Sequence, residues 1–253
     1  MKTTIHHISR IISALAAFSL VSALHGTTTP VAPVVTLTAY DNLPVDGTGN
    51  GHNAAGDNIS SGEQDDANAK RLDRAVMVFS LPTLAEGEVL VSATLRFYVR
   101  TVSTDSATPD AILYHSQTQN RTTNNTAFYE DASYANTGLS AANTSMIASA
   151  SAPLLVTLDV TQWVKIDYQL DSGSVVSSFR IQVDNLEFVD DNQSRRYSFF
   201  GKNSESYAPQ LVIETGPAIP EPGHLALLFG ATGLSGALVF RCCFRKGQAL
   251  VVE

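Results

Sequence analysis

Apolar and polar residues alternate with a period of two, and not of 3.6, along much of the segment from residue 34 to residue 215. This period is typical of half-buried β-strands, because successive side chains point to opposite faces. The candidate strands are also rich in β-branched and aromatic residues, which suit a pleated surface. They cover residues 34–39, 74–80, 89–99, 111–115, 154–158, 179–183, 196–200 and 210–213.

The alternation is clearest between residues 92 and 99. The odd-numbered residues 93–99 are apolar and are predicted to face the core, whereas Thr94, Arg96 and Tyr98 are predicted to face outward. One short helical turn is predicted at 162–165, with Asp159 or Thr161 as its N-terminal cap.

Two irregular stretches, 41–73 and 116–152, separate the strands and are predicted to be long loops, the first with one short strand. Many strands, almost no helix and turn residues between the strands indicate an all-β fold. We therefore expect a β-sandwich, jelly-roll-like domain at 34–215. Its 182 residues are enough for a single core.

The N-terminal residues have the layout of a secretory signal. Lys2 and Arg10 flank a polar start, residues 11–24 are almost all apolar, and small residues lead up to Ala23. This apolar stretch is shorter than the roughly 20 residues that a membrane-spanning helix needs. We therefore predict a signal peptide at 1–23, cleaved after Ala23.

The C-terminal residues have a three-part layout. A linker at 216–224 contains Pro220, Glu221 and Pro222, an uncharged apolar run follows at 225–240, and a tail at 241–253 begins with a basic cluster. The run is just long enough to cross a bilayer. The basic cluster predicts a cytoplasmic stop and places residues 24–220 outside. Its members are Arg241, Arg245 and Lys246.

This three-part layout resembles the PEP-CTERM sorting signal, which exosortases recognise. The resemblance implies a precursor held in the inner membrane, processing near Pro220, Glu221 and Pro222 by an exosortase-type enzyme, and delivery to the cell envelope or an exopolysaccharide matrix. Cys242 and Cys243, the only cysteines, lie in the tail, so the exported part is expected to fold without disulfides.

The order of elements in the predicted sandwich resembles the DNRLRE-type domain, which is grouped with carbohydrate-binding module family 96. The resemblance rests on Phe79-Ser80-Leu81-Pro82, Ser92-Ala93-Thr94-Leu95, Asp159-Val160-Thr161, and Ser204-Glu205 ahead of Pro209-Gln210-Leu211. It implies an accessory, non-catalytic domain that contacts polysaccharide. Where many relatives carry Trp-x-Glu, this chain has Phe128-Tyr129-Glu130.

For polysaccharide binding, the most concentrated basic spots are Arg195-Arg196-Tyr197 and Lys70-Arg71, which could bind acidic groups through bidentate contacts. An equally good interpretation is that the positive charges of the arginines balance the negative charges of the neighbouring Asp190 and Asp191. Tyr129, Tyr134, Tyr197 and Tyr207 remain open as stacking platforms. Trp163 follows a capped turn between apolar residues and is predicted to lie in the core.

Other chemistry has less support in the sequence. The acidic runs Asp65-Asp66 and 184–192 supply the oxygen ligands that Ca²⁺ prefers, but a solvated turn explains them as well, and no EF-hand spacing occurs. No pair of histidines has zinc-site spacing, and no Gly-x-Ser-x-Gly occurs. The net charge of −8 argues against nucleic acid as a partner.

The sequence therefore predicts an exported, non-enzymatic β-sandwich that contacts envelope or matrix polysaccharide and needs no cofactor, with Ca²⁺ left open. Two alternatives remain. One is a structural surface or matrix protein without sugar specificity, and the other is a polysaccharide-degrading enzyme on the same scaffold.

Overall fold

The computed structural model describes residues 26–42, 49, 51–54, 56–66, 69–104, 108–116, 127–170, 175–184 and 188–218. The chain divides into two compact units, Met1–Gly216 and Pro217–Glu253, and of the second only residues 217 and 218 are described. Helices long and apolar enough to span a membrane are not found among the described residues. The predicted signal and sorting residues lie outside them: Ala23, Pro220, Glu221, Pro222, Arg241, Arg245 and Lys246.

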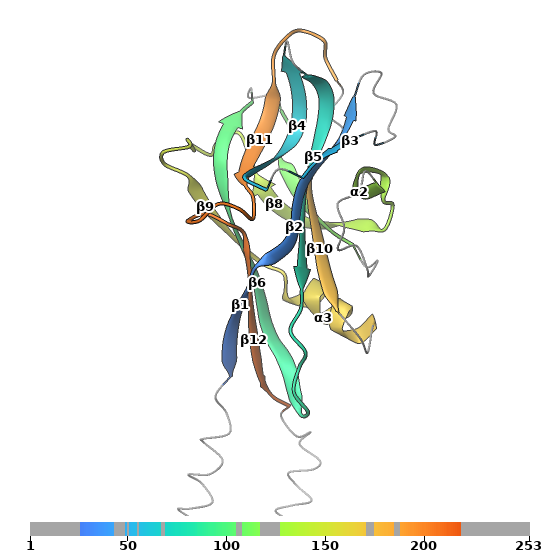
Figure 1. Cartoon of the computed structure of the whole chain (residues 1–253), viewed down its shortest axis with the longest axis vertical. Coiled ribbons are helices and arrows are strands. Elements are labelled where there is room, and N and C mark those ends of the chain that lie inside the picture. Colours follow the sequence, from blue (N-terminus) through green and yellow to red (C-terminus); the bar gives the residue numbers. More distant parts are fainter. Residues whose placement is uncertain are drawn as a thin grey trace, which may run out of the picture. The chain divides into compact units, whose positions relative to one another are not determined.

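The described residues are mostly antiparallel β-sheet (Figure 1). The strands are β1 (Thr27–Val31), β2 (Pro33–Asn42), β3 (Gly51–Asn53), β4 (Asn58–Asp66), β5 (Ala69–Ser80), β6 (Glu88–Ser103), β7 (Ala111–Ser116), β8 (Tyr134–Ala142), β9 (Leu154–Asp159), β10 (Val176–Val183), β11 (Arg195–Phe200) and β12 (Gln210–Pro217). The described helices are α2 (Ala127–Glu130) and α3 (Thr161–Leu170).

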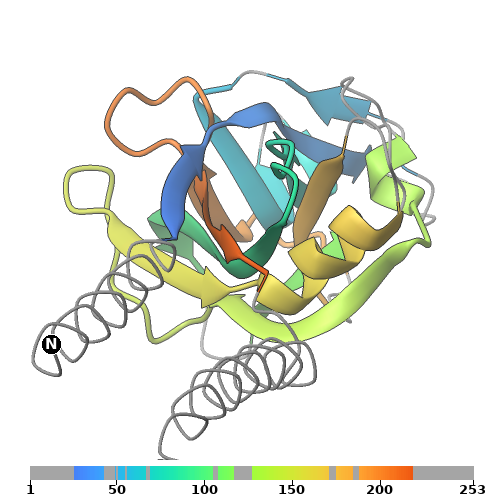
Figure 2. The ribbon, with the colours of Figure 1, turned by 90° about the horizontal axis from the view of Figure 1, so that it is seen from below.

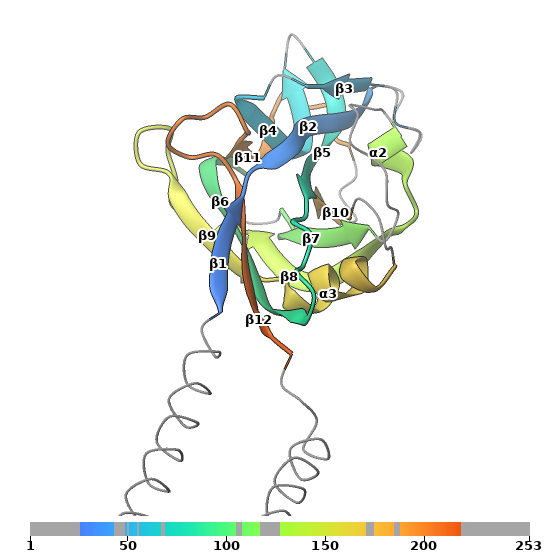
Figure 3. The same cartoon turned by 60° about the horizontal axis from the view of Figure 1, so that its bottom comes forward.

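The strands pair in the order β1-β12-β6-β11-β4-β5-β10-β7-β8, while β2 pairs with β5 and β3, and β9 pairs with β6. The sheet folds over, so that the half with β6, β11 and β12 faces the half with β5, β10 and β7 across one core (Figure 3). The prediction of an all-β, sandwich-like fold is thus confirmed. Each of the eight predicted strands corresponds to a strand of the structure.

The main core lies between these two halves. Alternate residues of β6 point into it, and Ala93, Leu95, Phe97 and Val99 have no exposed surface, as predicted. Phe97 meets Phe199 of β11 edge to face, with ring centroids 5.6 Å apart. Each such large apolar side chain contributes about 1.5–3 kcal/mol by leaving water.

Strand β5 is buried on both faces. Ala75, Met77 and Phe79 belong to the main core, whereas Val76 and Val78 pack on the other side against β2 and against the short helix α2. This explains why residues 75–79 are continuously apolar and do not alternate. The segment around α2 thus forms a second, smaller core on the back of the sheet.

Two arginines hold α2 in place. Arg180 is 4% exposed, and its guanidinium donates hydrogen bonds to the carbonyl oxygens of Phe128 and Tyr129, both at 2.9 Å. It also lies over the Tyr134 ring, 4.3 Å from the centroid. Arg74 donates to the Tyr129 carbonyl and lies 4.0 Å from the Tyr129 centroid. Burial lowers the pKa of Arg180 to about 10.

The two predicted loops contain more structure than expected. The stretch 41–73 includes β3, β4 and the start of β5, and the stretch 116–152 includes α2 and β8. Strand β4 is polar, with Ser61, Glu63 and Asp65 fully buried next to Ile59. Because its inward positions hold carboxylates and a hydroxyl, it lacks the apolar alternation on which the prediction relied.

Helix α3 is longer than the predicted turn, but it begins as expected. Asp159 Oδ1 accepts hydrogen bonds from the backbone N–H of Thr161 at 2.9 Å and from its hydroxyl at 2.6 Å. The Thr161 hydroxyl also accepts the N–H of Ala93, which ties the helix to β6. Trp163 packs, partly buried, against the main core.

The first and last described strands lie side by side. Strand β1 pairs antiparallel with β12, so that Thr27 is opposite Thr215, and their hydroxyl oxygens are 2.8 Å apart. The ends of the described domain, near residues 26 and 216, therefore emerge together.

Candidate functional site

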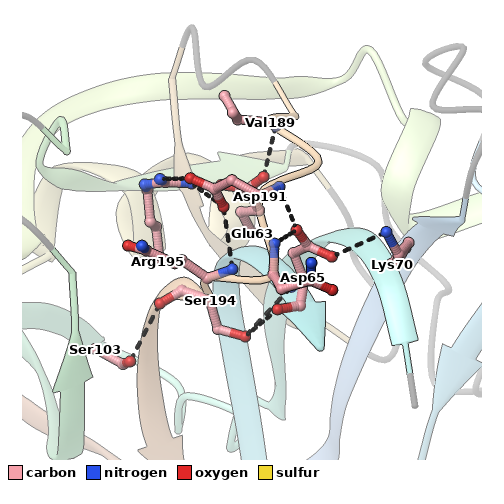
Figure 4. A network of polar contacts seen from close by, with 10 residues as sticks. Glu63, Asp65, Lys70, Ser103, Val189, Asp191, Ser194 and Arg195 are labelled. Carbon is pink, nitrogen blue, oxygen red and sulfur yellow. Dashed lines mark hydrogen bonds and ion pairs between the residues drawn. The ribbon is translucent and has the colours of Figure 1, made fainter. Parts of the chain in front are cut away.

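The predicted basic site around Arg195 is an internal ion-pair network (Figure 4). Arg195 Nη1 donates to Oε2 of the fully buried Glu63 at 2.9 Å, and Arg195 also pairs with Asp191, whose pKa it lowers. Glu63 Oε1 accepts the backbone N–H of Val189 at 2.6 Å. The guanidinium therefore attaches the loop 188–194 to β4.

Asp65 holds the same loop from the neighbouring inward position of β4. It has no exposed surface, and its Oδ2 accepts the N–H of Asp191 at 2.8 Å and the N–H of Asn192. Lys70 Nζ lies 3.5 Å from Asp65 Oδ1 and contacts Asp190 as well. Asn192 has a φ of 57°, the left-handed conformation that Asn adopts more readily than most residues.

The two predicted acidic runs thus lie close together, but their carboxylates are engaged by backbone N–H groups and basic side chains of the protein itself. Asp65 accepts the backbone N–H of Asp191, although their runs are far apart in sequence, and Lys70 pairs with Asp65 while Arg195 pairs with Asp191. Within the described ranges, no group of three or more His, Cys, Asp or Glu is arranged to hold a metal ion.

The three residues Arg195, Arg196 and Tyr197 do not present one ligand-binding surface. Tyr197 has no exposed surface and lies in the main core, and its hydroxyl donates to the Pro109 carbonyl at 3.3 Å. Neighbouring residues of a strand face opposite ways, so Arg196 lies on the other face of β11, half-buried. A ligand therefore cannot stack on Tyr197 beside Arg196 in this structure.

The second basic spot, Lys70-Arg71, is also engaged internally. Arg71 Nε lies 2.8 Å from Oδ1 of the buried Asp73, and its guanidinium lies 4.2 Å from the Tyr40 ring centroid. Burial raises the pKa of Asp73, while Arg71 and Arg196 act in the opposite direction.

A polar recess of about 110 Å³ adjoins Asp73, Arg74, Tyr129 and Asp184. The polar groups around it are largely bonded to one another: Asp184 accepts the hydroxyl of Tyr114, and its Oδ1 accepts from the side chain of Gln182 at 2.8 Å. The recess therefore offers few free polar groups to a ligand.

Of the four tyrosines considered as stacking platforms, only Tyr207 presents an accessible ring. Tyr129, Tyr134 and Tyr197 are at most 5% exposed, whereas Tyr207 is half-buried. Its ring meets that of Tyr98 at 5.0 Å and 63°, and that of Phe200 at 4.8 Å and 37°. The three rings form a cluster on the outer side of β6 and β11, which we call the aromatic face.

The aromatic face has an arginine border. Arg96 is exposed and Arg100 is half-buried, each two residues from Tyr98 along β6. Arg96 and Tyr98 line a small pocket of about 70 Å³ together with Ser206, Ala208 and Gln210. In the part of the chain that the structure describes, no carboxylate forms an ion pair with either arginine, in contrast to Arg195.

The loop 201–209, which carries Tyr207, is held in place by backbone contacts. The N–H of Gly201 donates to the Asp57 carbonyl at 2.8 Å, and the N–H of Lys202 donates to the Thr36 hydroxyl at 2.9 Å. A Cβ at Gly201 would lie 2.2 Å from the Gly56 carbonyl oxygen, so only glycine fits. The loop lies on the same side of the sandwich as the loop 143–153 (Figure 2).

Among the described residues, the histidines give no accessible catalytic pair. His115 Nε2 lies 2.9 Å from Asp167 Oδ2, between β7 and α3, and both side chains are 1% exposed. Burial raises the pKa of Asp167, against the hydrogen bond from His115. A substrate cannot reach this pair in the structure.

Sequence reasoning identified Tyr207 as a candidate and predicted that Arg96 and Tyr98 face outward, but it did not join them. The partners are more than 100 residues apart, and only the β6–β11 pairing brings Tyr98 near Phe200. In the comparisons with known proteins, no family model and no characterised protein matches the chain.

Proposed function

We propose that this chain is an exported, non-catalytic β-sandwich protein, sorted to the cell envelope or extracellular matrix through its C-terminal segment, that contacts polysaccharide through the aromatic face. The observation that carries the proposal is the cluster of Tyr98, Tyr207 and Phe200 with Arg96 and Arg100 at its border.

The chemistry of the face suits a sugar chain. Aromatic rings offer flat apolar area at little cost in conformational entropy, and the apolar face of a pyranose packs against such rings. Arginine donates in a fixed fork to hydroxyls or carboxylates. Because the pocket is small, we expect weak binding at one face and recognition of an extended chain.

The sorting part of the proposal rests on the sequence pattern at both ends. One structural feature supports it: Thr27 and Thr215 are paired, so the residues that lead to the predicted signal peptide and to Pro220-Glu221-Pro222 leave the domain at one place. This arrangement is compatible with a precursor that has both predicted membrane segments in one membrane. Deleting residues 220–246 should send the product to the medium without a membrane-held form.

Affinity electrophoresis of the full chain in mild detergent tests the binding proposal. Gels would contain an anionic or a neutral polysaccharide. We expect retardation on at least one of them, lost in the double variant Tyr98→Ala/Tyr207→Ala. The matched variant Tyr98→Phe/Tyr207→Phe keeps both rings and should keep the retardation. Equal mobility of wild type and the alanine variant on every gel would refute binding at this face.

The variant Arg196→Ala measures how far this half-buried arginine, which lies next to the buried ion-pair network, contributes to polysaccharide binding. Arg195→Ala is not a clean test of binding, because removing its guanidinium leaves the buried Glu63 without a cationic partner.

A further inference from the structure

Four described strands pair with a neighbour on one side only: β1, β3, β8 and β9. The free backbone N–H and C=O groups of an edge strand pair readily with another strand. Proteins usually block such edges with short strands, proline, charged residues or irregular pairing.

Three of these edges are blocked. Strand β1 contains Pro30, which lacks an N–H, and β3 is three residues long. Strand β8 pairs irregularly with β7 on both sides of Ile112, and its Gly138 has a φ of 74°. None of the three offers a regular ladder to another strand.

Strand β9 contains no proline and pairs regularly with β6, and its only charged residue stands at its C-terminal end. Residues 154–158 read Leu-Leu-Val-Thr-Leu, without charge or proline, and Leu154 and Leu155 are 37% and 38% exposed. The one charged residue of the strand, Asp159, caps α3. A short, uncharged, β-branched and apolar segment on an open edge is the type of sequence that pairs with a copy of itself.

We propose that β9 is a self-association edge and that its occupant is β9 of a second copy of this chain, paired antiparallel. Residues that are opposite each other in the new pair must lie on the same face of the sheet. The register centred on Val156 meets this condition over five residues and places Leu154 opposite Leu158 of the second copy. On the outer face it places Leu155 opposite Thr157 of the second copy.

The charges permit this contact. The net charge of −8 makes two copies repel over most of their surface, but the pairing segment is uncharged. In the centred register, Asp159 of one copy approaches the end of β6 that carries Arg100 in the second copy. The two backbones are then two strand spacings apart, about 9.6 Å. Opposite charges therefore lie on the same line across the sheet at both ends of the pair.

The pairing also extends the aromatic face. Leu155 is opposite Tyr98 and Thr157 is opposite Arg96 in the β6–β9 ladder. Two copies joined at β9 therefore present both aromatic faces on one side of a continuous sheet. The self-association does not depend on sugar binding; where both hold, two linked faces bind one polysaccharide chain with higher avidity.

Hydrogen exchange of the full chain in mild detergent, measured at low and high protein concentration, tests the proposal. We expect amide exchange in residues 154–158 to slow about tenfold or more at high concentration, while residues 27–31 on the β1 edge are unchanged. Thr157→Lys and Leu155→Lys place a charge on the open edge and should abolish the slowing. Thr28→Lys, another exposed threonine on an edge strand, should leave it intact.

Exchange of residues 154–158 that is the same at both concentrations would overturn the proposal, even if the chain self-associates through other segments. Slowing that survives both lysine variants of β9 would overturn it as well. Thermal unfolding of each variant, followed by circular dichroism, confirms that the variants are folded before exchange is compared.

Discussion

Arg195 Nη1 lies 2.9 Å from Oε2 of Glu63, a carboxylate with no exposed surface. The arginine that the sequence offers as a ligand-binding group thus serves a buried acid of its own domain. Asp65, two residues further along β4, acts in the same way on the loop amides. The acids of β4 therefore stabilise the loop 188–194 and engage Arg195, whereas no described carboxylate pairs with Arg96 or Arg100 of the aromatic face.

Replacing Glu63 should destabilise the domain. Glu63→Gln removes the charge opposite Arg195 and weakens the acceptor for the Val189 N–H, and we expect a loss of about 2–3 kcal/mol in the free energy of unfolding. Chemical denaturation measures it. Glu86→Gln, at an exposed acid of the β5–β6 turn, should change stability by less than about 0.5 kcal/mol. Equal effects of the two variants would contradict the role given to Glu63.

Gly201 should matter for binding although it touches no ligand. A Cβ at this position meets the Gly56 carbonyl oxygen, so Gly201→Ala must displace the loop that carries Tyr207. We expect a cost of about 1–3 kcal/mol and loss of retardation in affinity gels, with Tyr98 and Phe200 unchanged. Ser206→Ala, in the same loop, should retain the wild-type stability. If Gly201→Ala were retarded as much as wild type, the position of the loop would not affect binding.

Asp167 should make stability depend on pH in a defined direction. Its folded pKa lies above the ordinary 3.8, because burial disfavours the charged form. The folded state therefore binds the proton more tightly than the unfolded state. The corresponding stability is complete below 3.8 and is lost as the pH rises through the folded pKa.

Wild type and Asp167→Asn, compared by chemical denaturation between about pH 3.5 and pH 5, test this direction. The stability of wild type relative to the variant should fall as the pH rises across this window. A difference that stays constant or grows with pH would show that the Asp167 carboxylate is not disfavoured by its burial.

The cap at Asp159 predicts the opposite dependence. Hydrogen bonds from the Thr161 hydroxyl and N–H lower the pKa of Asp159, so its contribution is present above 3.8 and is lost as the pH falls through the folded pKa. At neutral pH, Asp159→Ala should cost about 0.5–1 kcal/mol, since the residue is largely exposed, whereas Asp159→Asn keeps an acceptor and should cost little. Equal losses of stability in the alanine and asparagine variants would show that Asp159 does not cap the helix.

How much of the fold could be predicted depended on which residues faced the core. The strands with apolar inward positions, such as β6 and β5, were predicted correctly. The stretch that contains β4 was predicted as a long loop with one short strand, because Glu63 and Asp65 occupy inward positions of β4 and the amides that they accept lie more than 120 residues away. An acid that is buried against distant amides looks, in sequence, like an acid in a solvated loop.

The same limit applied to the candidate site. Alternation along β6 predicted the outward direction of Arg96 and Tyr98, because this depends on local geometry alone. The ion pair between Arg195 and Glu63 and the contact between Tyr98 and Tyr207 depend on which strands become neighbours. Sequence spacing does not contain that information.

The pairing of Thr27 with Thr215 has a mechanical consequence. If both ends of the chain are held, tension between them acts along the hydrogen bonds that join β1 to β12. These hydrogen bonds then break one pair at a time, beginning near Thr27 and Thr215. Such a load detaches β1 before it reaches the ladders around β6. Strand β1 is then expected to separate first under tension, while the rest of the sandwich stays folded.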